Sequence, residues 1–295
     1  MSINSSIEIP VVAGPTASGK TKYAIRLAKS IGAEIVSADS MQIYRHLDIG
    51  TAKATLSERE EVPHHMIDIV EPDVRFSVAD YQEMALKCIK AIIARGRKVV
   101  VAGGTGLYIS ALINNIKYPD FASDPAFREK LERDAAATGN AAIYSELMRI
   151  DPAAAQRIHV NDKKRIIRAL EVYHATGRTI SEHERLSKTT PPEYCYNLIG
   201  LNIPRDILYR RIDARVEQMM NDGLVSETRA VYERYGKAGT ALQAIGYKEL
   251  ISYFEGELTL CEATERIKTE TRRFAKRQMT WFRAMPGMKW IDVVD

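Results

Sequence analysis

The chain has 295 residues, a length typical of about two domains, and its 42 Lys and Arg against 38 Asp and Glu leave a formal net charge of +4. Hydrophobic residues make up 45% and charged residues 27%, a composition that excludes a chain disordered as its main state. The apolar runs are far shorter than the ~20 residues that span a bilayer, no secretory signal is visible, and the three cysteines form no CxxC pair, so we expect a reduced, cytoplasmic protein with no membrane span.

Strands and helices alternate in the first third of the chain. Four short apolar runs predict strands, at residues 7–13, 33–38, 65–70 and 98–102. Two segments have helical spacing, at residues 20–30 and 78–94. This alternation predicts an α/β fold, in which a parallel sheet is covered by helices on both faces.

The pattern changes to helices after Pro119. Asp124-Pro125 and Asp151-Pro152 each predict a helix start, and Asn161 or Asp162 can begin a helix that ends near Gly177. We therefore expect a helical insertion at residues 119–194, between core segments at 1–118 and 195–295. In the second core segment the sequence predicts a strand at 195–203, then helices as far as Arg283, then an edge strand at 289–294.

A phosphate-binding loop connects the first predicted strand to the first predicted helix. Its pattern, G-x-x-x-x-G-K-[ST], is carried by Gly14, Pro15, Thr16, Ala17, Ser18, Gly19, Lys20 and Thr21. In such a loop, backbone N–H groups and the helix N-terminus attract phosphate oxygens, the lysine adds a positive charge and the hydroxyl can hold Mg²⁺. The motif predicts binding of a di- or triphosphate, and an NTPase or a small-molecule kinase is the default interpretation.

Asp39 is the one acid at the end of a predicted core strand near this loop. A phosphoryl-transfer enzyme of this kind usually places an acid on a further core strand, yet the Val-rich strand at 98–102 is followed by Gly-Gly-Thr-Gly. Because the carboxyl ends of parallel strands line the ligand crevice, Asp39 should face the phosphate loop. It could act there as a metal ligand or as a general base.

Five further segments resemble the tRNA dimethylallyltransferase family, the bacterial tRNA isopentenyltransferases. They are residues 37–44 (SADSMQIY), 48–53 (DIGTAK), 103–108 (GGTGLY), 164–172 (KRIIRALEV) and 275–283 (AKRQMTWFR). With the phosphate loop they run in order through essentially the whole chain. The resemblance implies a phosphate-loop NTPase-like core with a helical insertion that binds tRNA, and transfer of a dimethylallyl group from its pyrophosphate ester to N6 of adenosine 37.

The resemblance also implies roles for residues of the core. The loop would hold the departing pyrophosphate with Lys20, Thr21 and Mg²⁺, and Arg215 would assist, with Arg211 as the alternative. Asp39 would accept the proton of the adenosine amine. Asp39 itself, Ser40, Met41, Gln42 and Thr105 would contact the flipped base or its neighbours, although Gln42 could instead only hold a loop.

Contacts with the anticodon stem-loop are implied for a further set of residues: Arg128, Lys164, Arg165, Ile166, Ile167, Arg168, Gln243, Gly246 and Lys248. Seven basic residues between Arg266 and Arg283 add a second basic cluster, which could equally be a solvated helix face. Trp281 and Phe282 are expected in the core. A monomer that acts on tRNA is the favoured interpretation, and a small-molecule kinase or an adenylate isopentenyltransferase are the alternatives.

Overall fold

The computed structural model describes residues 7–119, 124–187, 189–237 and 239–293. The chain divides into two compact units, a core unit formed by Met1–Ile113 with Glu193–Asp295 and an insertion unit formed by Asn114–Pro192. The insertion was expected at 119–194, so the unit begins and ends a few residues earlier along the chain.

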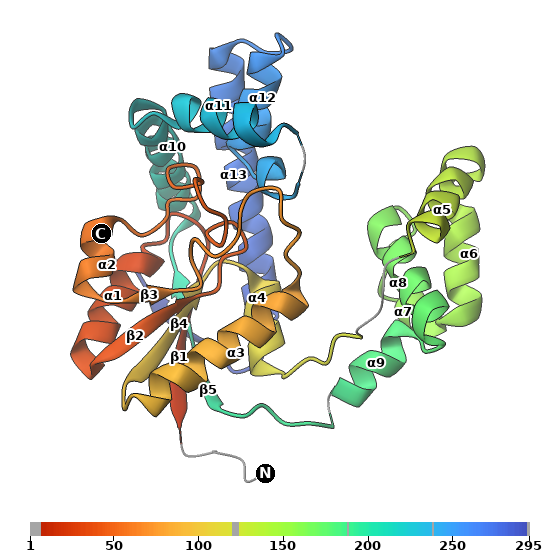
Figure 1. Ribbon diagram of the computed structural model, residues 1–295, viewed down its shortest axis with the longest axis horizontal. Coiled ribbons are helices and arrows are strands. Elements are labelled where there is room, and N and C mark those ends of the chain that lie inside the picture. The colour runs from red at the N-terminus through yellow and green to blue at the C-terminus, as the bar shows by residue number, and fades with distance from the viewer. Residues whose placement is uncertain (1–6, 120–123, 188, 238, 294–295) are drawn as a thin grey trace. The chain divides into compact units, whose positions relative to one another are not determined.

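The core unit contains a six-stranded parallel sheet in the order β3-β2-β4-β1-β5-β6 (Figure 1). Its strands are β1 (Glu8–Ala13), β2 (Ala33–Ser37), β3 (His64–His65), β4 (Lys98–Gly103), β5 (Cys195–Asn202) and β6 (Lys289–Asp292). In the centre of the sheet Val11 of β1 pairs with Val101 of β4, and Ile35 of β2 pairs with Val100. The predicted α/β fold with a parallel sheet is therefore confirmed.

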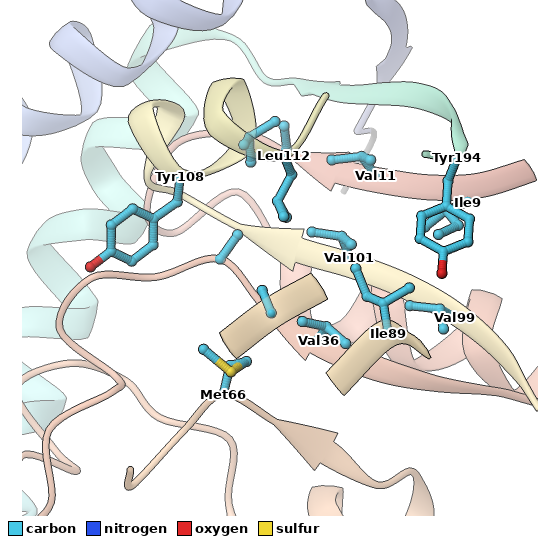
Figure 2. Close-up of a cluster of buried hydrophobic side chains, with 14 of the residues drawn as sticks. Ile9, Val11, Val36, Met66, Ile89, Val99, Val101, Tyr108, Leu112 and Tyr194 are labelled. Atoms are coloured by element: carbon cyan, nitrogen blue, oxygen red, sulfur yellow. The ribbon is translucent and has the colours of Figure 1, made fainter. Parts of the chain in front are cut away.

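Helices cover both faces of this sheet because its central strands are apolar on both sides. On one face, Val11, Val36 and Val101 pack against Ile89 of α3 (Val78–Ala94) and Leu112 of α4 (Gly106–Ile113), as Figure 2 shows. On the other face, Val12, Ile35 and Val100 pack against Ala24 and Ala28 of α1 (Lys20–Ile31). A polar strand face would have left one of these layers without a core.

A second hydrophobic cluster joins the loop after β2 to the C-terminal helices. Ile43, Tyr44 and Leu47 pack there against buried residues such as Val216 and Leu250. The helices of this part are α2 (Leu56–Glu61), α10 (Arg205–Asn221), α11 (Leu224–Tyr235), the short 3-10 helix η1 (Ala241–Gln243), α12 (Tyr247–Phe254) and α13 (Leu260–Arg283). This packing holds the C-terminal helices beside the loop that carries Asp39.

The insertion unit is entirely helical in the residues that the structure describes. Its helices are α5 (Pro125–Thr138), α6 (Asn140–Ile150), α7 (Pro152–Ala155), α8 (Lys163–Thr176) and α9 (Ile180–Ser187). The expected helix starts are confirmed, since the side chains of Asp124, Asp151 and Asp162 accept hydrogen bonds from the first turns of α5, α7 and α8. Leu131, Leu147 and other apolar side chains form a core of its own.

Two strands are shorter than the sequence predicts by two residues or more. The segment expected at 65–70 pairs with β2 only at His64–His65, because Met66 (φ 60°) and Asp68 (φ 55°) adopt left-handed backbone conformations that interrupt a strand. The last strand ends at Asp292, and Val294 lies outside the described residues. Within the described part of the chain, no helix has the length and apolar character needed to cross a membrane.

Gly103 allows the ends of β2 and β4 to approach each other closely. A Cβ atom at this position would overlap the carbonyl group of Ala38. The same approach permits two backbone hydrogen bonds, from Ala38 N to Ala102 O (2.8 Å) and from Thr105 N to Ala38 O (3.1 Å).

We predict that Gly103→Ala destabilises the protein by about 3 kcal/mol or more, because backbone atoms on both strands must move to admit the methyl group. The matched control is Gly32→Ala. Gly32 caps α1 at φ 65°, and a Cβ atom added there would have no other atom within 4 Å, so the substitution should cost only about 1–2 kcal/mol. Urea unfolding of both variants measures the difference. Equal destabilisation by the two substitutions would contradict the argument.

Candidate active site

A cavity of about 390 Å³ lies in the core unit, at the carboxyl ends of β2 and β4 and beside the phosphate loop. Several sequence-predicted residues from these strands and loops line it, namely Thr16, Lys20, Thr21, Asp39, Ser40, Met41, Gln42 and Thr105. Others reach it from the C-terminal helices and their connections, namely Arg215, Gln243, Gly246 and Lys248. The fold thus brings segments far apart in the sequence to one site.

The phosphate loop is shaped for an anion. Gly19 adopts a left-handed conformation (φ 84°) directly before α1, so that the helix N-terminus opens toward the cavity. The Ser18 side chain is fully buried, and its Oγ has no hydrogen-bond partner. Buried hydroxyl groups are normally paired, so Ser18 is an exception within the loop, and it lies behind the residues that line the cavity.

The Lys20 ammonium group is the principal positive charge of this loop. Its Nζ donates a hydrogen bond to Pro15 O (2.6 Å). Desolvation inside the cavity lowers the pKa of Lys20 to about 8; Asp39 opposes this shift and Arg215 adds to it. An anion bound in the loop would favour the charged form of the lysine.

Asp39 follows β2, and its loop is fixed to the end of β4. Its Oδ1 accepts a hydrogen bond from Met41 N (2.9 Å), and the next residue, Ser40, donates from its backbone N to Thr105 Oγ1 (2.9 Å). In the sheet, β4 lies between β2 and β1, the strand that leads into the phosphate loop. Strand β4 ends in glycine, without an acid. The carboxylate and the phosphate loop both line the same cavity.

The oxygen atoms around the cavity suit Mg²⁺ bound together with phosphates. Thr21 and Asp39 both line it, and Mg²⁺ prefers oxygen ligands from one or two side chains, from phosphates and from water. Among the described residues no group of three or more His, Cys, Asp or Glu could hold a metal by itself. Any metal here would therefore be held largely by the ligand's own phosphates.

Arg215 lines the cavity, whereas Arg211 is absent from the described residues around it. Both lie in α10. Burial lowers the pKa of Arg215, partly offset by the charge of Glu58. This placement favours Arg215 over Arg211 as the arginine that meets an anion.

Gln42 is already engaged by the protein. Its Nε2 lies 3.3 Å from both Thr51 O and Ala52 O, and its Oε1 accepts from Ser37 Oγ (3.2 Å). The alternative in which Gln42 holds a loop therefore describes its contacts in this structure. The loop it holds is also fixed by Glu227, whose carboxylate accepts from three consecutive backbone N–H groups at 48–50.

Helix α13 supplies residues at the cavity for which the sequence predicts no role in the active site. Phe274 and Arg277 line it, and the guanidinium carbon of Arg277 lies 5.9 Å from the centre of the Phe274 ring. Trp281 is 41% exposed, so its expected place in the core is wrong, whereas Phe282 is fully buried as expected. Gln278 also reaches the cavity, a position that no charge or spacing signal identified.

The residues of α8 that are predicted to contact tRNA fall into an exposed group and a buried group. Lys164, Arg165 and Arg168 are exposed on α8. Ile166 and Ile167 lie in the hydrophobic core of the unit, with exposed fractions of 0% and 2%, so the expectation that their side chains contact tRNA is wrong.

Arg128 is engaged within the insertion unit. Its guanidinium binds the carboxylate of Glu171, with Nε 2.9 Å from Oε1 and Nη2 3.2 Å from Oε2. The Glu171 side chain is buried, so this pair joins α5 to α8.

Comparisons with known proteins identify the family of this chain. Residues 42–285 match the family described as IPP transferase. The chain is 49% identical to a tRNA dimethylallyltransferase of Carboxydothermus hydrogenoformans, over 97% of this chain and 92% of the relative. It is 50% identical to the tRNA dimethylallyltransferase of Acetivibrio thermocellus, over 96% and 90%.

Two solved structures are also similar. A full-length tRNA isopentenylpyrophosphate transferase from Bacillus halodurans is 44% identical, with a TM-score of 0.71, and covers 97% of this chain and 89% of its own. A eukaryotic dimethylallyltransferase described as acting on tRNA is 30% identical, with a TM-score of 0.82, over 97% of this chain and 74% of its own. From its phosphate loop to its last helix, the chain belongs to the IPP transferase family.

Proposed function

We propose roles in catalysis for residues of the cavity. The chain is a tRNA dimethylallyltransferase, which forms N6-(dimethylallyl)adenosine at position 37 of tRNA. The observation that carries the proposal is a single cavity in which the phosphate loop faces Asp39, with no acid at the end of β4. This arrangement suits a reaction in which a diphosphate leaves and a proton is removed, and it needs no phosphoryl transfer.

The phosphate loop stabilises the leaving group. Lys20 and the backbone N–H groups at the start of α1 surround the diphosphate, and Arg215 meets it from α10. Negative charge on the diphosphate grows as the C–O bond to the dimethylallyl group breaks, so these groups bind the transition state more strongly than the substrate. When bound, Mg²⁺ would supply further positive charge there, with the Thr21 hydroxyl among its ligands.

Asp39 accepts the proton. The lone pair of the adenosine amine is delocalised into the purine, so the amine is a weak nucleophile. As N6 forms its bond to the allylic carbon, that carbon loses its bond to the diphosphate oxygen, and one N6 proton passes to the Asp39 carboxylate. The hydrogen bond from Met41 N holds this carboxylate in place for the transfer.

The target base must leave the stack of the anticodon loop to enter the cavity. Thr105, Ser40 and Phe274 line the cavity, and we propose that they contact this base or its neighbours. Gln42 contributes by holding the loop at 50–52, and Gln243, Gly246 and Lys248 form another part of the wall. We further propose that the protein acts as a monomer.

The exposed cations of α8 are proposed to bind tRNA phosphates. Lys164, Arg165 and Arg168 lie on the solvent side of a helix whose buried side carries Ile166 and Ile167. Phosphate contacts of this kind position an RNA without reading its sequence. A tRNA substrate also supports a cytoplasmic location.

We predict that Asp39→Ala and Asp39→Asn still bind diphosphate but lose transfer by about 10²–10⁴-fold, because neither side chain accepts the proton. The assay incubates protein, dimethylallyl diphosphate, Mg²⁺ and an unmodified anticodon stem-loop, and then measures the mass gain on adenosine. Near-normal transfer by either variant would remove Asp39 from the mechanism.

We predict that diphosphate affinity depends on pH through Lys20. In the free protein the pKa of Lys20 is about 8, and a bound anion raises it. The affinity should therefore stay constant below about pH 8 and fall above it, by up to about tenfold per pH unit, because binding must then take up a proton.

Calorimetry with magnesium diphosphate between about pH 7 and about pH 9 measures this dependence. In the control variant, Lys20→Arg, the guanidinium stays charged throughout, so the fall should disappear. A wild-type affinity that is flat through pH 8 would refute the assignment.

We predict that Lys164→Ala and Arg165→Ala each weaken tRNA binding and reduce its dependence on salt by about one released counterion. The control is Lys87→Ala on α3, a well-exposed lysine paired with Glu83 and remote from α8 in sequence. Filter binding at several salt concentrations gives the slopes. If all three variants share the wild-type slope, α8 is not the phosphate-binding surface.

A further inference from the structure

Gln278 connects two loops that border the cavity. It lies in α13, and its side chain is only 7% exposed. Its Oε1 accepts a hydrogen bond from Thr16 N of the phosphate loop (2.8 Å), and its Nε2 donates to Gly104 O of the loop after β4 (2.8 Å). One carboxamide therefore satisfies a donor from one loop and an acceptor from the other.

The network dictates the orientation of this amide. A backbone N–H needs an acceptor and a carbonyl needs a donor, and the carboxamide of Gln serves both at every pH, whereas a Glu of the same length does so only when it is protonated. A charged side chain here would lie close to Lys20, since a Cβ atom on Gly104 would lie 3.7 Å from Lys20 Nζ and would overlap Gln278 Nε2. Gly104 thus keeps open the space that the amide occupies.

The contacts of Gln278 continue to the loop that carries Asp39. Thr105 follows Gly104, and its Oγ1 accepts from the backbone N of Ser40, which is the residue after Asp39. The same Thr105 donates its own backbone N–H to Ala38 O, the residue before Asp39. A displacement of Gly104 therefore moves both anchors of the Asp39 loop relative to the phosphate loop.

We propose that Gln278 is a positioning residue, which sets the separation between the diphosphate cradle and Asp39 through its two hydrogen bonds. It acts through Thr16 and Gly104 rather than on the reacting atoms. The inference rests on the proposed function, because the separation matters only if the diphosphate and the adenosine amine occupy opposite walls. A misplacement of about 1 Å can cost about 10²-fold in rate.

The first test compares Gln278→Met with a matched control, Gln82→Met. Gln82 is also 7% exposed, and its Nε2 donates to a backbone carbonyl, Ala111 O (3.0 Å), but it joins α3 to α4 away from the cavity residues. Both variants should lower the melting temperature, Gln278→Met by more because it loses two hydrogen bonds and Gln82→Met loses one. Only Gln278→Met should lower kcat for transfer, by about tenfold or more, while its KM for the stem-loop changes less than twofold.

The second test uses Gln278→Glu and its control, Gln82→Glu. A protonated carboxyl group can accept from Thr16 N and donate to Gly104 O, as the amide does, but a carboxylate can only accept. The activity of Gln278→Glu relative to wild type should therefore increase as the pH falls, by up to about tenfold per unit. The same ratio for Gln82→Glu should stay constant at every pH where that variant is folded.

The outcomes of these tests distinguish a failure of the positioning role from a failure of the proposed function. If wild-type protein transfers the dimethylallyl group but Gln278→Met and Gln82→Met have equal kcat, or the Gln278→Glu ratio is independent of pH, the positioning role is refuted. If wild-type protein does not transfer the group to RNA, the proposed function itself fails.

Discussion

The close contact between the ends of β2 and β4 is the constraint on which the site depends. Gly103 admits the carbonyl group of Ala38 where any side chain would collide with it, and Thr105 then binds the residues on both sides of Asp39. Since β4 also pairs with β1, which leads into the phosphate loop, the carboxylate is held at a fixed distance from the cradle. A larger residue at the end of β4 would separate the two halves of the site.

Burial in this cavity also explains why Lys20 and Arg215 favour an anionic ligand. Lys20 and Arg215 both lose solvation there, and the pKa of each is lowered by burial. Two partly desolvated cations in one cavity favour an anion that restores their interactions. A diphosphate ester already carries negative charge and gains more as its C–O bond breaks, so the electrostatic gain increases along the reaction.

The sequence predicted the parts of the site that lie within short motifs. The phosphate loop has a local pattern, and Asp39 could be placed opposite it because the carboxyl ends of parallel strands meet at one edge of the sheet. Gln278 could not be placed, because its role depends on how α13 packs against loops more than 170 residues away. The resemblance implies tRNA contacts for Ile166 and Ile167 because it extends over the whole segment at 164–172. The helical period instead places these two residues on the buried side of α8, away from Lys164, Arg165 and Arg168.

The most direct test of the account is a crystal structure of the protein with a non-cleavable thio analogue of dimethylallyl diphosphate, Mg²⁺ and an unmodified anticodon stem-loop. The account predicts the diphosphate group within the Gly14–Thr21 loop, in contact with Lys20. It also predicts the flipped adenine with N6 within hydrogen-bond distance of the Asp39 carboxylate, about 3 Å. An adenine amine that meets a different side chain, or a diphosphate bound outside the loop, would contradict it.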